Sequence, residues 1–157
     1  MYSKFLEIIS YSVESIYVYK EMYKHKDLYK NNNAYIIMLN NCAMMAIVRL
    51  CNIFGSNREE NHWKNVLKSK ADDFQKSVIL EVFEDLNEFN NYWETLKNFR
   101  DKYVTHFIDD SYVMPYFDIG LKLLKKSYVF VMEQYGTLEF DEFVDNTISN
   151  VEKILFK

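Results

Sequence analysis

The chain has 157 residues, a length typical of one domain that buries a core without disulfides or a metal. Its net charge of −4 disfavours a broad surface that coats nucleic acid, although a small local phosphate site remains compatible with it. Three glycines and one proline leave few turns and no flexible linker, and no run of about 18 apolar residues predicts a membrane span. We therefore expect a single domain over residues 1–157.

The spacing of the two cysteines indicates the cellular compartment in which the protein is expected. Cys42 and Cys51 lie nine residues apart, which on one helix turns them to opposite sides, roughly 13 Å apart along the axis. They cannot pair with each other, and free thiols are typical of a reducing environment. The N-terminal apolar run carries Glu7 and Glu14 and is not typical of a signal peptide. We expect a cytoplasmic protein with no membrane partner.

Apolar residues recur at steps of three and four along the first half of the chain, which is the spacing of one helical face. They predict helices over residues 4–29 and 34–54. Asparagines end the first helix, and Gly55 follows the second, where a left-handed C-cap would fall. A polar loop and a short helix over residues 62–69 come next.

A longer helix is predicted to begin at a cap on Asp72 or Asp73 and to run to His106, with an interruption near residues 87–91. Its apolar positions alternate steps of four and three, as a helix-packing seam does. They are Val82, Leu86, Phe89, Trp93 and Leu96. Arg100 holds the next seam position and is therefore expected to face inward.

Two further helices complete the predicted fold. One begins at Pro115, a good first-turn residue, and ends at Gly136, and the last covers residues 140–156. Packing the apolar stripes together gives an all-α fold, an up-and-down bundle of four long helices plus one or two short ones.

Arg100 raises a question of pairing, because a buried guanidinium is costly unless an anion accompanies it. Asp101 is adjacent, but adjacent helical residues do not face each other, so the sequence does not predict this pair. His106 lies six residues on, which in an unbroken helix is about 600° of turn and leaves the two side chains about 120° apart. They converge only if the helix is distorted near Thr105, or if a second copy supplies the complementary group.

The segment RDKYVTH, residues 100–106, resembles the R-x4-6-H signature of HEPN domains, and looks most like the abortive-infection AbiU-type branch. The resemblance implies a four-helix bundle that dimerises through its motif-bearing helices. It also implies a metal-independent endoribonuclease of toxin–antitoxin or phage-defence systems. Arg100 would bind the scissile phosphate, His106 would act as general acid or base, and Asp101 would orient them, with two copies completing one site.

The residue types suit that chemistry. Attack by the RNA 2′-OH needs proton transfer near neutral pH, which histidine provides, and a guanidinium matches phosphate oxygens in bidentate fashion. Lys97, Lys102 and Tyr103 are expected to contact the RNA substrate. No Cys-x-x-Cys or His-rich spacing predicts a metal, and no cofactor is expected.

The expected partners are a second copy, RNA, and an antitoxin or nucleotidyltransferase. Some HEPN toxins carry a tyrosine that a nucleotidyltransferase modifies two residues after the histidine, where this chain has Ile108. The alternative is a catalytically inactive helical module that dimerises or binds a nucleotide or RNA. Three other residues keep two interpretations each: Arg49 as a helix-end salt bridge or a second phosphate contact, His25 as a surface or RNA-binding residue, and His62 as part of a solvated loop with a helix start or a metal site.

Overall fold

The computed structural model describes residues 2–105, 115–133, 144–146, 148–150 and 153, and for residues 103–105 it describes the backbone alone. Within these ranges the regular elements are all helical and no strand occurs. The prediction of an all-α fold is confirmed.

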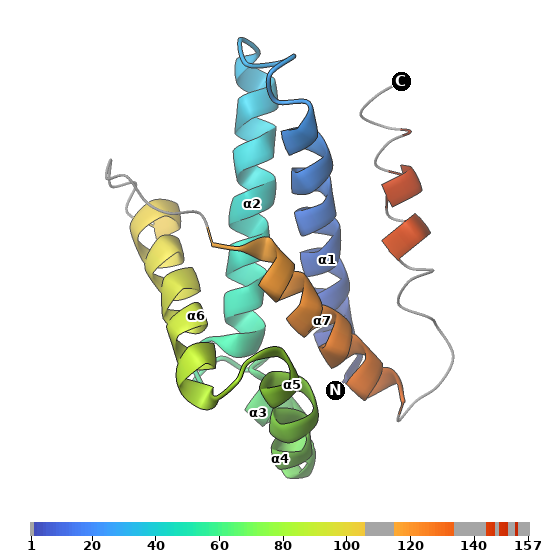
Figure 1. Cartoon of the computed structure of the whole chain (residues 1–157), viewed down its shortest axis with the longest axis vertical. Coiled ribbons are helices and arrows are strands. Elements are labelled where there is room, and N and C mark those ends of the chain that lie inside the picture. Colours follow the sequence, from blue (N-terminus) through green and yellow to red (C-terminus); the bar gives the residue numbers. More distant parts are fainter. Residues whose placement is uncertain (1, 106–114, 134–143, 147, 151–152, 154–157) are drawn as a thin grey trace.

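Two long antiparallel helices, α1 (Tyr2–Lys24) and α2 (Asn33–Phe54), pack against each other along much of their length (Figure 1). Asn32 caps α2, because its Oδ1 accepts a hydrogen bond of 3.1 Å from the N–H of Tyr35. α1 ends earlier than predicted, and turns occupy residues 25–31. Among the described helices, α2 is long and apolar enough to cross a membrane, a property that core helices of soluble proteins share. One of its faces is buried against α1 and α6.

Gly55 ends α2 by close approach and not by a left-handed conformation. Its φ of −81° and ψ of −126° contradict the expected left-handed cap, although its N–H does donate to the Cys51 carbonyl at 2.8 Å. A Cβ at this position would lie 2.1 Å from that carbonyl oxygen and 3.2 Å from Nε1 of Trp93. Glycine is needed here because backbone and indole leave no room for a side chain.

Short helical elements fill one end of the molecule, as Figure 1 shows. α3 (Trp63–Leu67) is followed by the 3₁₀ turn η1 (Lys68–Lys70), α4 (Ala71–Phe74), the π-helical turn η2 (Gln75–Ile79) and α5 (Leu80–Val82). Lys68 bends the chain after α3 with a φ of +47°. The prediction of a cap at Asp72 or Asp73 is wrong, because both lie inside α4.

The break in the predicted long helix comes before residues 87–91, at Phe83–Asp85, where Phe83 and Asp85 are extended. Asp85 then caps α6 (Leu86–Phe99): its Oδ1 accepts from the N–H groups of Asn87 and Glu88 at 2.7 and 2.8 Å. Leu86 is 40% exposed and so does not belong to the packing seam. The seam that α6 buries consists of Phe89, Leu96 and Phe99, with Trp93 half-buried.

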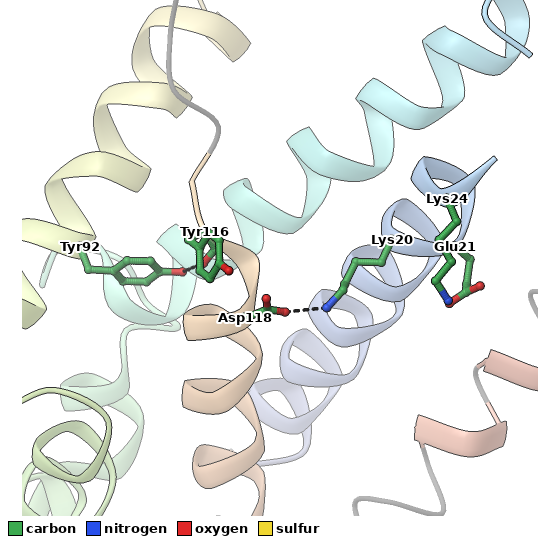
Figure 2. Close-up of polar contacts among 6 residues, drawn as sticks. All are labelled: Lys20, Glu21, Lys24, Tyr92, Tyr116 and Asp118. Carbon is green, nitrogen blue, oxygen red and sulfur yellow. Dashed lines mark hydrogen bonds and ion pairs between the residues drawn. The ribbon is translucent and has the colours of Figure 1, made fainter. Parts of the chain in front are cut away.

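The helix α7 (Phe117–Met132) begins just after the buried Pro115, near the predicted start, and crosses α1 obliquely (Figure 1). Lys20 pairs with Asp118 at 2.5 Å, and the Tyr92 hydroxyl donates to the Tyr116 carbonyl at 3.3 Å, so that α7 is joined to both α1 and α6 (Figure 2). Gly136, where α7 was expected to end, lies outside the described residues. So does most of the predicted helix over residues 140–156, of which residues 144–146, 148–150 and 153 are helical.

Candidate functional site

Arg100 lies where α6 ends and the π-helical turn η3 (Arg100–Thr105) begins. Its backbone N–H is shared between the carbonyls of Leu96 and Lys97. In a π turn the hydrogen bonds run from residue i to i+5, and such turns are rare and frequently mark functional sites. The helix is therefore distorted over residues 100–105, within the segment that carries the Arg–His motif. Such a distortion is one of the two conditions under which the side chains of Arg100 and His106 could approach each other.

Asp101 is an anion partner of Arg100, contrary to the expectation from helix geometry. Its Oδ1 accepts from Nε at 2.8 Å and lies 2.7 Å from Nη2. The long arginine side chain reaches the neighbouring carboxylate although the two Cβ atoms point apart. Burial is the largest single influence and lowers the pKa of Arg100, but the hydrogen bond to Asp101 and the charges of Cys51, Asp101 and Glu59 together raise it by more, so that the guanidinium pKa is raised overall.

The seam position of Arg100 is confirmed in part, because its side chain is 27% exposed and so neither buried nor fully solvated. η3 packs on α2, and the nearest titratable group of that helix is Cys51. Burial raises the pKa of the Cys51 thiol to about 11, while the charge of Arg100 acts in the opposite direction. Cys51 is thus a neutral, buried thiol at neutral pH and not a nucleophile.

Of the predicted site residues, the structure brings Arg100 and Asp101 into contact. Lys97 lies one turn before Arg100 on α6, with its ammonium 5.4 Å from the centre of the Trp93 ring. Lys102 is exposed. His106 lies outside the described residues, and so does the side chain of Tyr103, so their roles remain those that the resemblance implies.

Arg49 contacts α1 instead of forming a helix-end salt bridge. Its Nη1 donates to the Tyr11 carbonyl at 2.7 Å and to the Ser15 hydroxyl at 2.6 Å, and its guanidinium lies 5.1 Å from the centre of the Tyr11 ring. These contacts join α2 to α1 and give Arg49 a structural role.

A pocket that the sequence did not predict lies among the end of α2, the start of α3 and α6. It has a volume of about 300 Å³, and its aromatic wall consists of Phe54, Trp63, Phe89 and Trp93. We call it the indole pocket, because both tryptophans of the chain line it. The residues come from three separate segments, so no single stretch signals the site; the one available signal was that only two tryptophans occur.

His62 is buried at the edge of the indole pocket, so its assignment to a solvated loop is wrong, whereas the helix start predicted with that loop is confirmed because His62 is the N-cap of α3. It is 2% exposed and caps α3, since its Nδ1 accepts from the N–H of Lys64 at 3.2 Å. Burial, with a smaller contribution from the charge of Lys64, lowers the pKa of His62 to about 4. The ring is therefore neutral at neutral pH.

The lowered pKa of His62 predicts that acid destabilises the fold. The unfolded chain takes up a proton on this ring below about pH 6.5, whereas the folded chain does so only near pH 4. The stabilising contribution is complete above about pH 6.5 and is lost as the pH falls toward 4. We expect it to be on the order of 2 kcal/mol, measured by urea unfolding at about pH 7 and pH 4.5. His62→Asn keeps a capping acceptor and should show a smaller pH dependence; an equal dependence in both proteins would assign the effect to other groups.

A second groove, of about 370 Å³, lies between η2 and α7. Lys122, Lys125 and Lys126 line it together with Glu81 and Glu133, and Lys126 pairs with Glu81. Because acids and bases alternate around its rim, its charge does not select one class of ligand.

Across the described ranges, no three His, Cys, Asp or Glu side chains cluster in a way that could hold a metal ion. Comparisons of the chain with protein-family models, with curated proteins and with solved structures found no match. The proposals below therefore depend on the residues, their geometry and the sequence motif.

Proposed function

We propose that the protein is a HEPN-type, metal-independent endoribonuclease of a toxin or phage-defence system, acting in the cytoplasm as a homodimer with a composite Arg/His site. The observation that carries this proposal is the position of Arg100. Its side chain is half-buried, paired with Asp101, and placed at the first residue of a π-helical turn that covers residues 100–105 of the motif. An antitoxin or nucleotidyltransferase is the expected partner of such a protein.

Each residue of the proposed site has a distinct chemical role. Cleavage through the RNA 2′-OH builds negative charge on the phosphate, and a guanidinium held in place before the reaction stabilises that charge without reorganising. Asp101 fixes the Nε edge of Arg100 and thereby limits its rotamers. His106 supplies or accepts the proton, since an imidazole titrates near the working pH. Lys97 and Lys102 add positive charge on either side of Arg100 and attract the RNA backbone.

The second copy is part of the proposal because the resemblance to HEPN domains implies a site that two chains complete; the divergence of about 120° applies to a regular helix, and Arg100–Thr105 are π-helical. In a two-fold dimer the same surface meets itself, so the Arg100 of one chain is brought near the His106 of the other. The partial exposure of Arg100 allows it to reach such an interface.

One observation favours a second function, that of a helical module that binds RNA or a nucleotide without cutting it. Asp101 already engages Arg100 through both Nε and Nη2, so a phosphate must compete with this carboxylate. A guanidinium that is neutralised in this way stabilises developing charge less strongly.

The test is cleavage of a labelled single-stranded RNA by the purified protein in excess chelator. We expect fragments that end in a 2′,3′-cyclic phosphate, and we expect DNA of the same sequence to stay intact because it has no 2′-OH. His106→Ala, prepared in parallel, controls for contaminating nuclease. Binding of RNA without cleavage would favour the non-catalytic module, and the absence of both binding and cleavage would contradict both functions.

A further inference from the structure

Both tryptophans that line the indole pocket carry a buried indole N–H for which the described residues offer no acceptor. Nε1 of Trp63 and Nε1 of Trp93 are both buried, and neither has a hydrogen-bond partner in the described part of the chain. An indole nitrogen can only donate, and a buried donor without an acceptor costs about 1–3 kcal/mol. Two such groups on residues of one pocket suggest an acceptor from outside the described part of the chain.

The rest of the lining also offers donors and positive charge. Because Nδ1 of His62 accepts from the N–H of Lys64, the neutral ring carries its proton on Nε2. The Lys64 ammonium lies 5.1 Å from the centre of the Trp63 ring. No carboxylate belongs to the lining residues. A molecule that enters the pocket therefore meets donors and a cation, which suits an anion rich in acceptors.

The shape of the pocket limits the size and kind of that anion. A volume of about 300 Å³ is at the small end of ligand sites and fits one or two rings. Phe54 and Phe89 meet edge to face with ring centres 6.4 Å apart, and Phe74 stacks on the far side of Trp63 at 5.2 Å. Gly55 keeps space open beside the Trp93 nitrogen, where a Cβ would come within 3.2 Å. These surfaces suit a flat aromatic molecule.

We propose that the indole pocket binds a small aromatic carboxylate, whose ring packs against the phenylalanine and tryptophan side chains and whose oxygens accept from the two indole N–H groups. Lys64 balances the negative charge. The indole nitrogens are shielded from solvent, so binding requires lining side chains to shift and open a path to them. This site is separate from Arg100 and does not depend on the nuclease proposal.

The chain allows a direct test, since its only two indole N–H groups give two cross peaks in a ¹H–¹⁵N spectrum of the full-length protein. Benzoate is the probe, with benzyl alcohol and acetate as controls that lack the carboxylate or the ring. We expect benzoate to shift both indole peaks saturably with a Kd of about 1 mM or tighter. At equal concentrations both controls should shift them far less. Equal shifts with benzyl alcohol or with acetate, or no shift with benzoate, would overturn the proposal.

Substitutions then separate the contribution of the indole N–H donors to binding from that of the aromatic rings. Trp63→Phe and Trp93→Phe keep an aromatic side chain but lose the N–H, and each should weaken benzoate binding by about 10-fold. Lys64→Gln should weaken it similarly, while Lys68→Gln, on an exposed lysine outside the pocket, should leave it unchanged. For the tryptophan variants, the remaining indole peak reports both folding and binding. Unchanged affinity in both Trp→Phe variants would show that the indole donors take no part.

Discussion

Replacing Arg100 by alanine is expected to lower the rate of RNA cleavage by at least about 100-fold while the helical circular dichroism stays the same. The guanidinium is the permanent cation of the proposed site, and Asp101 holds it in position through Nε and Nη2. Asp101, which loses this partner, is 44% exposed, so water can solvate its carboxylate and the variant should stay folded. The measurement is the initial rate of cleavage of a labelled RNA at saturating protein.

Two matched variants make this result specific. Arg58→Ala removes the same residue type from an exposed loop and should leave the rate unchanged. Arg100→Lys keeps the charge but loses the planar fork, so its rate should lie between the wild-type and alanine rates. If Arg100→Ala cleaves RNA as fast as Arg58→Ala does, Arg100 is not part of a catalytic site.

Replacing Phe74 by alanine is expected to lower the free energy of unfolding by about 3–5 kcal/mol, the largest effect on stability among the substitutions considered. Phe74 is fully buried at the end of α4, where its ring stacks on Trp63 at 5.2 Å and meets Phe130 edge to face at 5.2 Å. It therefore joins the short helices to α7, and alanine leaves a cavity between them. Urea unfolding, followed by circular dichroism, measures the change.

The control for Phe74 is an apolar residue without packing partners. Leu28→Ala removes a side chain that is 78% exposed and should change the free energy of unfolding by less than about 0.5 kcal/mol. Phe74→Leu keeps much of the volume and should cost less than alanine does. A loss below about 1 kcal/mol for Phe74→Ala would mean that the short helices are not anchored through this ring.

Helical periodicity was sufficient for α1 and α2, but it did not predict how the third segment divides into α4, η2, α5 and α6, nor where most helices end. The stripe through Leu39, Ala43 and Leu50 predicted α2 nearly to the residue, because a long amphipathic pattern depends on many positions. Caps depend on one. Asp72 and Asp85 are equally good capping residues in sequence, and only the extended backbone at Phe83–Asp85 decides that Asp85 is used. Gly55 was correctly placed at a helix end, but its reason is the close approach of the Cys51 carbonyl oxygen and, less severely, of the Trp93 indole, which is distant in sequence.

In the candidate sites too, a feature set by local spacing was predicted, and features set by side-chain reach or by packing were missed. The inward position of Arg100 followed from local spacing, and its half-buried side chain agrees with it. The Asp101 pair was missed, because the rule that adjacent residues face apart ignores the reach of a long side chain. The indole pocket could not be predicted, since Gly55, His62 and Trp93 converge only after α2, α3 and α6 have packed together.

The central claim is that Arg100 of one chain works with His106 of a second. Its most direct test is to coexpress Arg100→Ala and His106→Ala chains with different tags and to purify the mixed dimer through both tags. One intact arginine and one intact histidine then remain, on different chains. We expect the mixed dimer to regain up to about half of the wild-type cleavage rate, far above either parent dimer. A mixed dimer that is as inactive as its parents, or a chain that forms no dimer, would contradict the composite site.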